Sequence, residues 1–579
     1  MTMSNLMTIP PAFIMILGAI LLPFVAKKIR SAAFILFPLA ALFLILSYPD
    51  GATATAKVMS YELTLLKVDS LSRIFGIIFA FIAAAGGIYA FHMKDTGQQC
   101  AALLYAGGAL GVVFAGDFFT LFIYWEMMAW ASTYLIWARR TKEAQTAGFR
   151  YIIYHVLGGG ILFAGVLMHI AEVGNITLTT LVNDGTLSSW LILLGVIINA
   201  AVPPLHTWLS DAYPKATVTG AVFLSAFTTK TAVYVLARVF PGWEILLILG
   251  AIMTVYGVVF AVLANDIRGI LAYHIISQVG YMVAGVGIGT AMAINGTVAH
   301  AFSHILYKAL LFMGAGVVLH TTGTSKLTEL GGLAKKQKWV FAFYMIAAFS
   351  ISGFPLFNGF ISKSMTVAAA GAAGYDWALL LMTLAAVGTF LSVGLKLPYY
   401  TWLSKANPPQ DLEIRKTPLN MQIGMAVVAF MCVFHGIFYK HLFQYLPNPV
   451  DWEPFTAHHL AETIQILVFT FVVFWLLRPI LIPKAKIALD LDWFYRKPAR
   501  AIREMIVDPW TKFFDWIEKK MMVFVRKLVE FGKNPYLLFS KDKSIKYTPD
   551  AFREPVGQIM FAVFAIILVI VLVSYAYLI

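Results

Sequence analysis

Charged side chains occur inside stretches of this sequence that are otherwise apolar enough to cross a membrane. Glu126 lies at the centre of the apolar stretch 118–130, and Lys230 interrupts a later apolar stretch. A charge at mid-bilayer costs at least ~2.5–3.5 kcal/mol on insertion scales, so it persists only beside a partner or water. Two opposite charges at this depth indicate a path for ions, and the proton is the ion that such groups exchange directly.

A third apolar stretch carries a row of titratable side chains. His300, His304 and Lys308 follow one another at steps of four residues, which places them on one face of a helix. Histidine titrates near neutral pH, and water can join such groups into a proton wire. Two histidines at this spacing could also share a metal ion, but no carboxylate accompanies them and Lys308 would repel a cation. We therefore expect a proton path, with no metal and no cofactor.

Two further lysines lie in apolar stretches beyond this row. Lys363 follows a proline-containing interruption, and Lys396 lies within the stretch 377–403. Lys363 extends the row of groups that can gain and lose a proton. Lys396 has two interpretations, because a long lysine side chain can also extend from an apolar helix to the membrane surface.

The elements that position these residues follow from composition. The 579 residues are 60% hydrophobic and only 12% charged, and the mean hydropathy is +0.79. Apolar runs of about 17–25 residues recur along the chain, each long enough to cross a hydrocarbon core of ~30 Å. Such runs must be helical, because lipid offers no hydrogen-bond partner to the backbone. The sequence predicts an all-α polytopic membrane protein with about sixteen transmembrane helices.

The charge distribution indicates orientation and not nucleic-acid binding. The net charge of +14 comes mostly from short loops and from the region near the C-terminus, where basic residues act as orientation signals and contact lipid headgroups. The positive-inside rule then predicts a multi-pass protein of the cell (inner) membrane with its N-terminus outside. Cys100 and Cys432 are the two cysteines, which excludes a disulfide framework and cysteine-ligated zinc or iron–sulfur sites.

Two of the apolar stretches contain internal breaks. One break surrounds Pro203 and Pro204, and the other surrounds Pro355. Proline removes a backbone donor and clashes with the preceding turn, so each helix is expected to open in mid-membrane and line a wet cavity. We number these helices 7 and 12, and an odd shift of five helices predicts an inverted repeat.

This repeat suggests six segments along the chain. We expect helices 1–3 in 1–99, the first inverted repeat (helices 4–8) in 100–239, the second (helices 9–13) in 240–404, helices 14–15 in 405–483, an amphipathic lateral segment in 484–555 and a terminal anchor helix in 556–579. In 484–555, apolar residues recur at helical spacing and basic residues occupy much of the remaining surface, which is typical of a helix lying along a membrane. Pro498 and Pro509 are expected to break or bend it. A small soluble domain is the alternative, and the cytoplasmic side is the expected location.

Several short motifs resemble one family of membrane subunits. The stretch 204–212 resembles the PLHxWLPDA signature of the antiporter-like subunits of respiratory complex I, Mrp-type Na⁺/H⁺ antiporters and energy-converting membrane hydrogenases. The stretches 125–128, 230–234, 266–273 and 359–363 resemble that family's WEMM, LLKTAAY, DIKRLIAY and GFxSK elements. The resemblance covers roughly residues 70–440, and the lateral segment with its anchor is similar to the L-type subunit of complex I.

The resemblance implies a role for each matching residue. Glu126 would control the proton affinity of a lysine on helix 7, Lys230 would be the central relay, His300, His304 and Lys308 would carry the proton onward, and Lys363 would release it. The position of the family's helix-7 lysine is Asn199 here. Lys230 or His155 could replace that partner, or the switching pair could be lost. The further relay candidates are Asn199, His155, His206 and Lys396.

A carboxylate ~4 Å from a lysine is worth roughly 4 kcal/mol at an effective dielectric of ~20, enough to switch a partly desolvated amine between holding and releasing a proton. We found no nucleotide loop or redox ligand set in the sequence, so energy must come from a partner subunit or an ion gradient. Three classes remain open, each with other membrane subunits as partners and with either H⁺ alone or H⁺ and Na⁺ as ions. They are an Mrp-type antiporter subunit, the pumping arm of a complex I-like or hydrogenase enzyme, and the membrane half of a two-component inorganic carbon uptake system. An autonomous transporter is the fourth alternative.

Overall fold

The computed structural model describes residues 8–404, 414–485, 489–538 and 554–576, together with 542, 544–545, 547–548 and 550. Parts of the predicted segments 1–99, 405–483, 484–555 and 556–579 therefore lie outside the described residues. The chain divides into two units, Met1–Asp490 and Leu491–Ile579, which are described separately.

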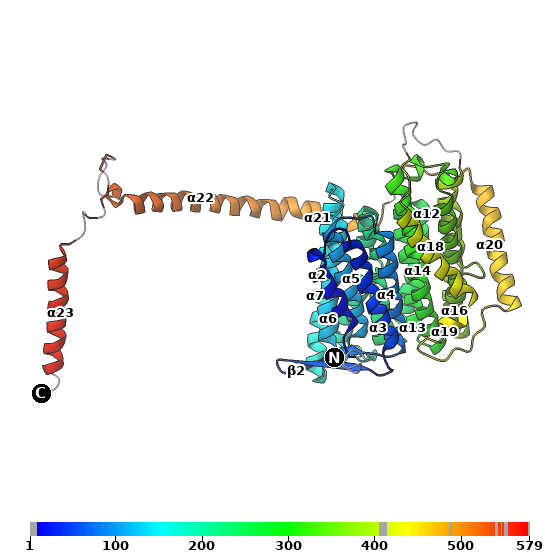
Figure 1. Cartoon of the computed structure of the whole chain (residues 1–579), viewed down its shortest axis with the longest axis horizontal. Helices are drawn as coiled ribbons and strands as arrows, with labels where there is room; N and C mark the ends of the chain where they lie inside the picture. Colours follow the sequence, from blue (N-terminus) through cyan, green and yellow to red (C-terminus); the bar gives the residue numbers. More distant parts are fainter. Residues whose placement is uncertain are drawn as a thin grey trace. The chain divides into compact units, whose positions relative to one another are not determined.

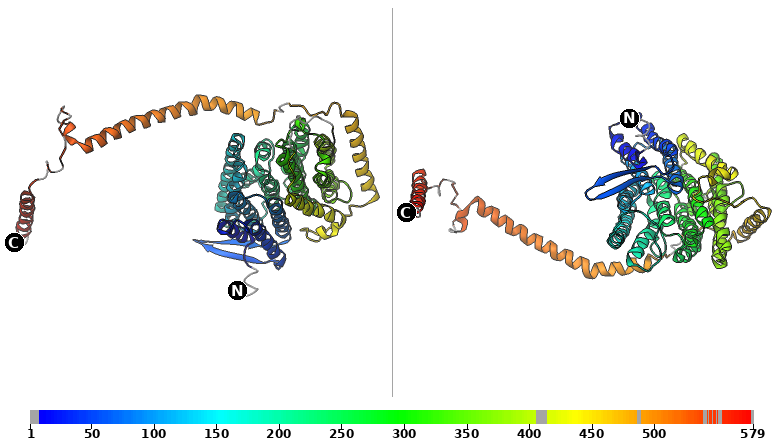
Figure 2. Two further views of the ribbon diagram at one scale, coloured as in Figure 1. Left: turned by 45° about the horizontal axis from the view of Figure 1, so that its top comes forward. Right: turned by 90° about the horizontal axis from the view of Figure 1, so that it is seen from below.

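The first unit is a bundle of helices (Figure 1 and Figure 2). Its first half contains α2 (Pro11–Leu21), α3 (Arg30–Ser47), α4 (Ser70–Tyr89), α5 (Thr96–Phe114), α6 (Phe118–Trp137), α7 (Lys142–Val173), α8 (Leu187–Asn199), α9 (Thr207–Ala212), α10 (Gly220–Ala226) and α11 (Thr228–Val239). Its second half contains α12 (Glu244–Leu263), α13 (Ile267–Ile288), α14 (Ala291–Thr322), α15 (Lys338–Ser352), α16 (Asn358–Ala372), α17 (Asp376–Thr389), α18 (Leu419–Ile437), α19 (Tyr439–Phe443) and α20 (Ala457–Leu477).

Among the described residues, 12 helices are long and apolar enough to cross a membrane, and three shorter apolar helices accompany them. The predicted all-α membrane architecture is confirmed. The predicted number of spans and the inverted orientation of the repeats stay predictions.

A β-hairpin at one end of the bundle was not predicted (Figure 1). Strands β1 (Thr53–Val58) and β2 (Tyr61–Lys67) pair in antiparallel fashion. The amide of Thr64 donates to the Asp117 carboxylate at 2.7 Å, which joins the hairpin to the start of α6. Two strands this short, lying between two long apolar stretches, give a much weaker sequence pattern than the stretches themselves.

Two segments of the bundle repeat the same order of elements. Asp117 caps the start of α6 and Asp266 caps the start of α13. The next helix in each segment has 32 residues and ends at a glycine with positive φ. These helices are α7, which ends at Gly174 (φ +71°), and α14, which ends at Gly323 (φ +78°). Each aspartate also forms an isolated bridge to the strand-like residue after that glycine, Thr177 or Lys326. Such a correspondence is what an internal repeat predicts.

The two proline-containing breaks are present. α8 ends at Asn199 and helical structure resumes in α9 at Thr207, whereas α15 ends at Ser352 and α16 begins at Asn358. A Cβ atom on Gly359 would lie 1.7 Å from the carbonyl oxygen of Ser350, so the two halves of the second broken helix approach each other at a distance that only glycine allows.

The helices of the bundle differ in the share of their residues that is buried. In α13 and α14, 94% of the most apolar window is buried, whereas in α20 only 17% is buried and the helix lies along the outside of the bundle (Figure 1). A helix that is buried all round lies in the core of the bundle. The helix that carries His300, His304 and Lys308 is therefore central.

The second unit begins with one continuous helical path. It contains α21 (Trp493–Ile502), a π-helical segment (Arg503–Val507) and α22 (Asp508–Lys533), followed by the short helix Pro535–Leu538 and by α23 (Val556–Ala576). Pro498 lies inside α21 and Pro509 lies in the first turn of α22, and neither ends the helical path. The helix is irregular between them, at the π-helical segment Arg503–Val507, and the bend expected from these prolines stays a prediction. The wider π turn before Pro509 keeps the path helical.

Candidate functional site

Glu126 lies on α6 against a glycine of α7. A Cβ atom on Gly159 would lie only 1.8 Å from Glu126 Oε1. This oxygen is buried and has no hydrogen-bond partner in the part of the chain that the structure describes. Gly159 therefore creates the space in which the carboxylate lies.

One turn before Gly159 on α7, His155 pairs with Asn199. His155 Nδ1 lies 2.8 Å from Asn199 Oδ1. Because this oxygen only accepts, the ring nitrogen Nδ1 carries the proton and Nε2 is left as an acceptor with no partner among the described residues. Asn199, at the position where the resemblance implies a lysine, thus fixes the tautomer of a buried histidine.

A cluster of hydroxyl groups separates this histidine from Lys230. The rings of His155 and Tyr151 lie 4.2 Å apart, and the Tyr151 hydroxyl interacts with Thr228 at the start of α11. The Tyr105 hydroxyl lies 2.6 Å from Thr228 Oγ1. Hydroxyls both donate and accept hydrogen bonds, so this cluster places polar groups between the ring of His155 and the start of α11, where Lys230 donates to Ser225 O and Thr229 Oγ1.

Lys230 lies immediately after a third interruption, between α10 and α11. The amide of Thr228 donates to the Tyr105 hydroxyl at 3.0 Å instead of to the preceding helical turn. The ammonium of Lys230, which is fully buried, donates to the carbonyl of Ser225 at 2.6 Å. The break therefore supplies a backbone oxygen that stabilises a buried charge. No ion pair joins Glu126 to Lys230 within the described residues, so Lys230 does not directly replace the missing helix-7 lysine.

The row on α14 continues from Lys230. His304 interacts electrostatically with both Lys230 and Lys308, and neither of its ring nitrogens has a hydrogen-bond partner among the described residues. His300 lies 3.3 Å from Ser362 Oγ on α16 and interacts electrostatically with Lys363. The structure thus brings five of the predicted residues into one buried line from α11 through α14 to α16.

Lys363 borders a cavity at the far end of this line. Its ammonium donates to the carbonyl of Ile351 at 3.2 Å, just before the second break. The cavity has a volume of about 150 Å³ and is also lined by His459 and Glu462 of α20. These two side chains line a neighbouring cavity of about 430 Å³ together with Asp451 and Glu453. Lys363 therefore lies beside a largely apolar cavity to which α20 contributes two titratable side chains.

Lys396 lies outside this line. It is buried in a π-helical segment, Phe390–Lys396, and donates to the carbonyl of Val262 at 2.6 Å. The side chain thus ends on backbone oxygen at the end of α12 and not in solvent.

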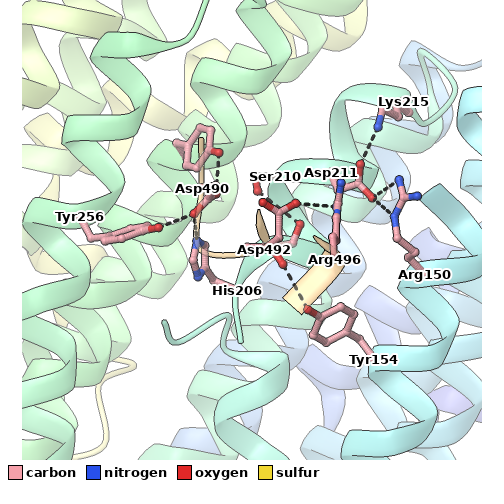
Figure 3. Close-up of polar contacts among 12 residues, drawn as sticks. Arg150, Tyr154, His206, Ser210, Asp211, Lys215, Tyr256, Asp490, Asp492 and Arg496 are labelled. Atoms are coloured by element: carbon pink, nitrogen blue, oxygen red, sulfur yellow. Dashed lines mark hydrogen bonds and ion pairs between the residues drawn. The ribbon is translucent and has the colours of Figure 1, made fainter. Parts of the chain in front are cut away.

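His206 lies after the first break and binds a carboxylate that was not among the predicted residues (Figure 3). His206 Nε2 lies 3.1 Å from Asp490 Oδ1. Tyr256 donates to the same oxygen, and the Tyr273 hydroxyl donates to Oδ2 at 2.7 Å. Burial raises the pKa of Asp490, but the bonds from His206, Tyr256 and Tyr273 outweigh it and hold this pKa at about 2. The segment before the second unit is thereby fastened to the break between α8 and α9.

A second carboxylate near this break belongs to the PLHxWLPDA-like stretch. Asp211 of α9 binds Arg150 of α7 at 2.6 Å and Lys215 at 2.5 Å (Figure 3). These ion pairs fix α9 against α7 and explain why an aspartate follows the broken helix.

Two further polar residues near the row on α14 were not predicted from the sequence. His274 of α13 lies 2.6 Å from Ser392 Oγ and interacts electrostatically with Lys308 and Lys363. Tyr307 lies 3.5 Å from His300 Nε2. His274 could have been found, because it is a titratable residue inside an apolar stretch. Asp490 could not, because its partners are distant in sequence. Within the described residues, no group of three or more metal-ligating side chains is arranged to hold a metal ion.

We expect that replacing Asp490 by asparagine loosens the residues around the first break. A hydrogen bond to a charged group contributes roughly 1.5–3 kcal/mol. Because the pKa of Asp490 is lower in the folded protein than in an unfolded chain, its contribution is complete above about pH 4 and is lost as the pH falls toward 2. Hydrogen exchange should therefore be faster at 200–210 and 489–490 in Asp490→Asn, and the wild type should approach the variant as the pH falls.

The exposed Asp515 of α22 provides the control, because Asp515→Asn removes the same charge. Exchange at the first break that is unchanged in Asp490→Asn, or equally faster in both variants, would contradict a specific role for Asp490.

These features define a class: polytopic membrane subunits of the antiporter-like type, in which interrupted helices border a buried line of lysines and histidines. Residues 115–391 match the family described as "NADH:quinone oxidoreductase/Mrp antiporter, TM". The chain belongs to this family. The matched range contains Glu126, Lys230, Lys363 and the row on α14, whereas Lys396 and Asp490 lie beyond it.

Three similar proteins illustrate the relationship. An uncharacterized protein of Methanocaldococcus jannaschii is 30% identical over 354 residues, which covers 58% of this chain and 73% of the relative. One of the Na⁺/H⁺ antiporter subunits of Alkalihalophilus pseudofirmus is 28% identical over 499 residues, covering 76% of this chain and 61% of the relative. In the structure of the Mrp complex from Dietzia sp. DQ12-45-1b, one chain aligns with a TM-score of 0.68 and 20% identity, covering 81% of this chain and 100% of that chain.

Proposed function

We propose that this chain moves protons across a cell membrane as one subunit of a multi-subunit complex. The observation that carries the proposal is the buried line from Lys230 through His304, Lys308 and His300 to Lys363. Each member can hold or release a proton, and titratable groups inside a membrane are costly enough that they mark ion pathways and proton relays. Membership of a family named for antiporter and quinone oxidoreductase transmembrane subunits supports the same conclusion.

Protons enter the proposed path beside Glu126. His155 Nε2 is available as an acceptor on the same face of α7, one turn from Gly159. The hydroxyls of Tyr151 and Thr228 lie between the ring of His155 and α11, and in this proposal water joins them to His155 and to Lys230. Asn199 holds His155 in the tautomer that leaves Nε2 available, so Asn199 and His155 together perform the role that the helix-7 lysine would have.

Protons leave the proposed path through the cavity beside Lys363. His459 and Glu462 of α20 border it and the neighbouring opening. A histidine and carboxylates at this position can accept the proton from Lys363 and pass it to water. We assign this end to the outer side, since basic loops orient the N-terminus outward and the lateral segment toward the cytoplasm of an inner-membrane protein.

The proposed coupling ion is Na⁺, and the proposed partners are other membrane subunits. The relative in Alkalihalophilus pseudofirmus is named as part of a Na⁺/H⁺ antiporter, and the Dietzia chain belongs to an Mrp complex. The long amphipathic path of α21 and α22 supports a neighbour in the membrane, because a helix of this kind offers an apolar face along its whole length.

Purification of the native complex tests this proposal. The chain is tagged in its host, solubilised in mild detergent, and the co-purifying subunits are identified by mass spectrometry. The complex is then reconstituted in vesicles that contain a pH-sensitive dye. We expect small membrane subunits and proton movement in response to an imposed Na⁺ gradient. A chain that purifies alone and moves no protons under either a Na⁺ gradient or a membrane potential would contradict the proposal.

The second candidate is the pumping arm of a redox enzyme, which the family description also names. Iron–sulfur subunits in the purified complex, with proton movement driven by an electron donor and not by Na⁺, would favour it. A large soluble zinc-containing partner would instead favour the inorganic carbon alternative.

A further inference from the structure

A basic pocket lies between the starts of α15 and α18. Its volume is about 420 Å³, which is room for on the order of ten water molecules. The residues that line it are Lys335, Lys336, Gln337, Lys338, Trp339, Val340, Ile414, Arg415, Lys416, Thr417 and Gln422. The pocket is separate from the line of buried lysines and histidines.

The described residues that line this pocket carry charge of one sign. Five of its lining residues are basic, and none of the described residues that line it is acidic. All five basic residues are exposed. Together they create a positive potential that attracts an anion.

Two helices begin beside the same pocket, since Lys338, Trp339 and Val340 of α15 line it and so do Thr417 and Gln422, which flank the start of α18. α15 begins at Lys338 after Gln337, whose side chain does not cap the helix because it bonds Thr321 at 2.8 Å and Trp402 at 3.2 Å. α18 begins at Leu419 after Pro418, which also provides no side-chain cap. The first amides of a helix lack intrahelical acceptors, and the helix dipole makes this end positive. Uncapped N-termini of this kind bind phosphate.

Exposed apolar side chains beside the pocket are typical of a membrane interface. Trp339 is 67% exposed and stacks on Phe343 with ring centroids 6.3 Å apart. Leu419, the first residue of α18, is 70% exposed. Tryptophan is enriched at the level of lipid headgroups, and basic residues at helix ends contact anionic lipids. Free phosphate would bind the cations and amides but would make no favourable contact with these apolar side chains.

We infer that this pocket binds the phosphate headgroup of an anionic membrane lipid. The phosphate oxygens accept hydrogen bonds from the lysines, from Arg415 and from the first amides of α15 and α18, and the acyl chains pass Trp339 and Leu419. A lipid bound here contacts the N-terminus of α15. The C-terminus of α15 lies at the second break, which is followed by α16, the helix that carries Lys363.

Lipid retention tests the inference. The full-length chain is incorporated into nanodiscs that contain neutral lipid and a small fraction of labelled phosphatidylglycerol, and the bound label is measured by native mass spectrometry after release. The test variant combines Lys336→Gln, Lys338→Gln and Arg415→Gln. We expect retention of the anionic lipid to fall at least about tenfold, because several cations act on one phosphate. Loss of Lys338 does not weaken α15, since a cation at a helix N-terminus is unfavourable.

The control variant removes three exposed cations elsewhere: Lys27→Gln, Lys28→Gln and Lys142→Gln. Retention that falls only in the test variant, and that survives millimolar inorganic phosphate, supports the inference. Equal retention in both variants overturns it. Displacement of the lipid by inorganic phosphate at that concentration also overturns it, because the pocket would then be a site for the free anion.

Discussion

Replacement of Lys230 by methionine should abolish coupled proton movement and leave the protein assembled. The ammonium of Lys230 is the first titratable group of the buried line, and methionine fills a similar volume without a proton to give. A positioned proton donor typically contributes a factor of 10²–10⁴, so we expect a loss of about 100-fold or more. Dye-monitored proton uptake into vesicles that contain the reconstituted complex measures it. The loss leaves the acceptors Ser225 O and Thr229 Oγ1 without this donor, but it also removes a desolvated charge, and these opposing effects should leave the complex assembled.

Lys230→Arg separates titration from charge. Arginine keeps the positive charge but does not release its proton in proteins, so this variant should be as inactive as Lys230→Met. Lys142→Met, which removes an exposed lysine at the start of α7, serves as the control. Full proton movement in Lys230→Arg would mean that a fixed charge suffices, and the proposed relay through this residue would be wrong.

Replacement of Gly159 by alanine should displace the Glu126 carboxylate and reduce proton movement about tenfold or more. The added Cβ atom would lie 1.8 Å from Glu126 Oε1, so one of the two must move, and the end of a flexible side chain moves more easily than a packed helix. A displacement of about 1 Å at a catalytic group can cost about 100-fold. Initial rates of proton uptake at several pH values measure the effect.

Two further variants test whether the effect of Gly159→Ala comes from the Glu126 carboxylate. Glu126→Asp shortens the side chain by one methylene, so the double variant Gly159→Ala/Glu126→Asp should recover part of the lost rate. Gly160 has nothing within 4 Å of an added Cβ atom, so Gly160→Ala should behave as the wild type. Equal losses in Gly159→Ala and Gly160→Ala would show that the effect comes from α7 itself and not from the carboxylate.

The fold could be predicted from the sequence where a local rule decides the outcome. Long apolar runs can only be helical in lipid, so they predict the membrane architecture. Proline interrupts a helix, so the positions of Pro203–Pro204 and Pro355 predict the two breaks. At Pro498 and Pro509 the same rule does not end the helix. A π-helical segment lies between the two prolines, and sequence spacing gives no sign of it.

The candidate site was predictable in its residues but not in its connections. His300, His304 and Lys308 had to share a face because of the helical period, and the structure retains that row. The hydroxyls of Tyr105 and Tyr151 were not selected, because a tyrosine in an apolar stretch looks like core packing until its partner Thr228 is placed beside it. Asp490 bonds residues more than 200 positions away, and such contacts are set by tertiary packing.

The carbonyl of Ser225, at the interruption between α10 and α11, affects how long Lys230 stays without its proton. While Lys230 is charged, this oxygen solvates it as a water molecule would. When the lysine gives its proton away, the oxygen loses the charged donor that it faces, and a weakened or unmet bond of this kind costs about 1–3 kcal/mol. That cost is recovered as soon as a new proton arrives. The gap between α10 and α11 therefore favours refilling of Lys230, so the lysine spends little time empty between one transfer and the next.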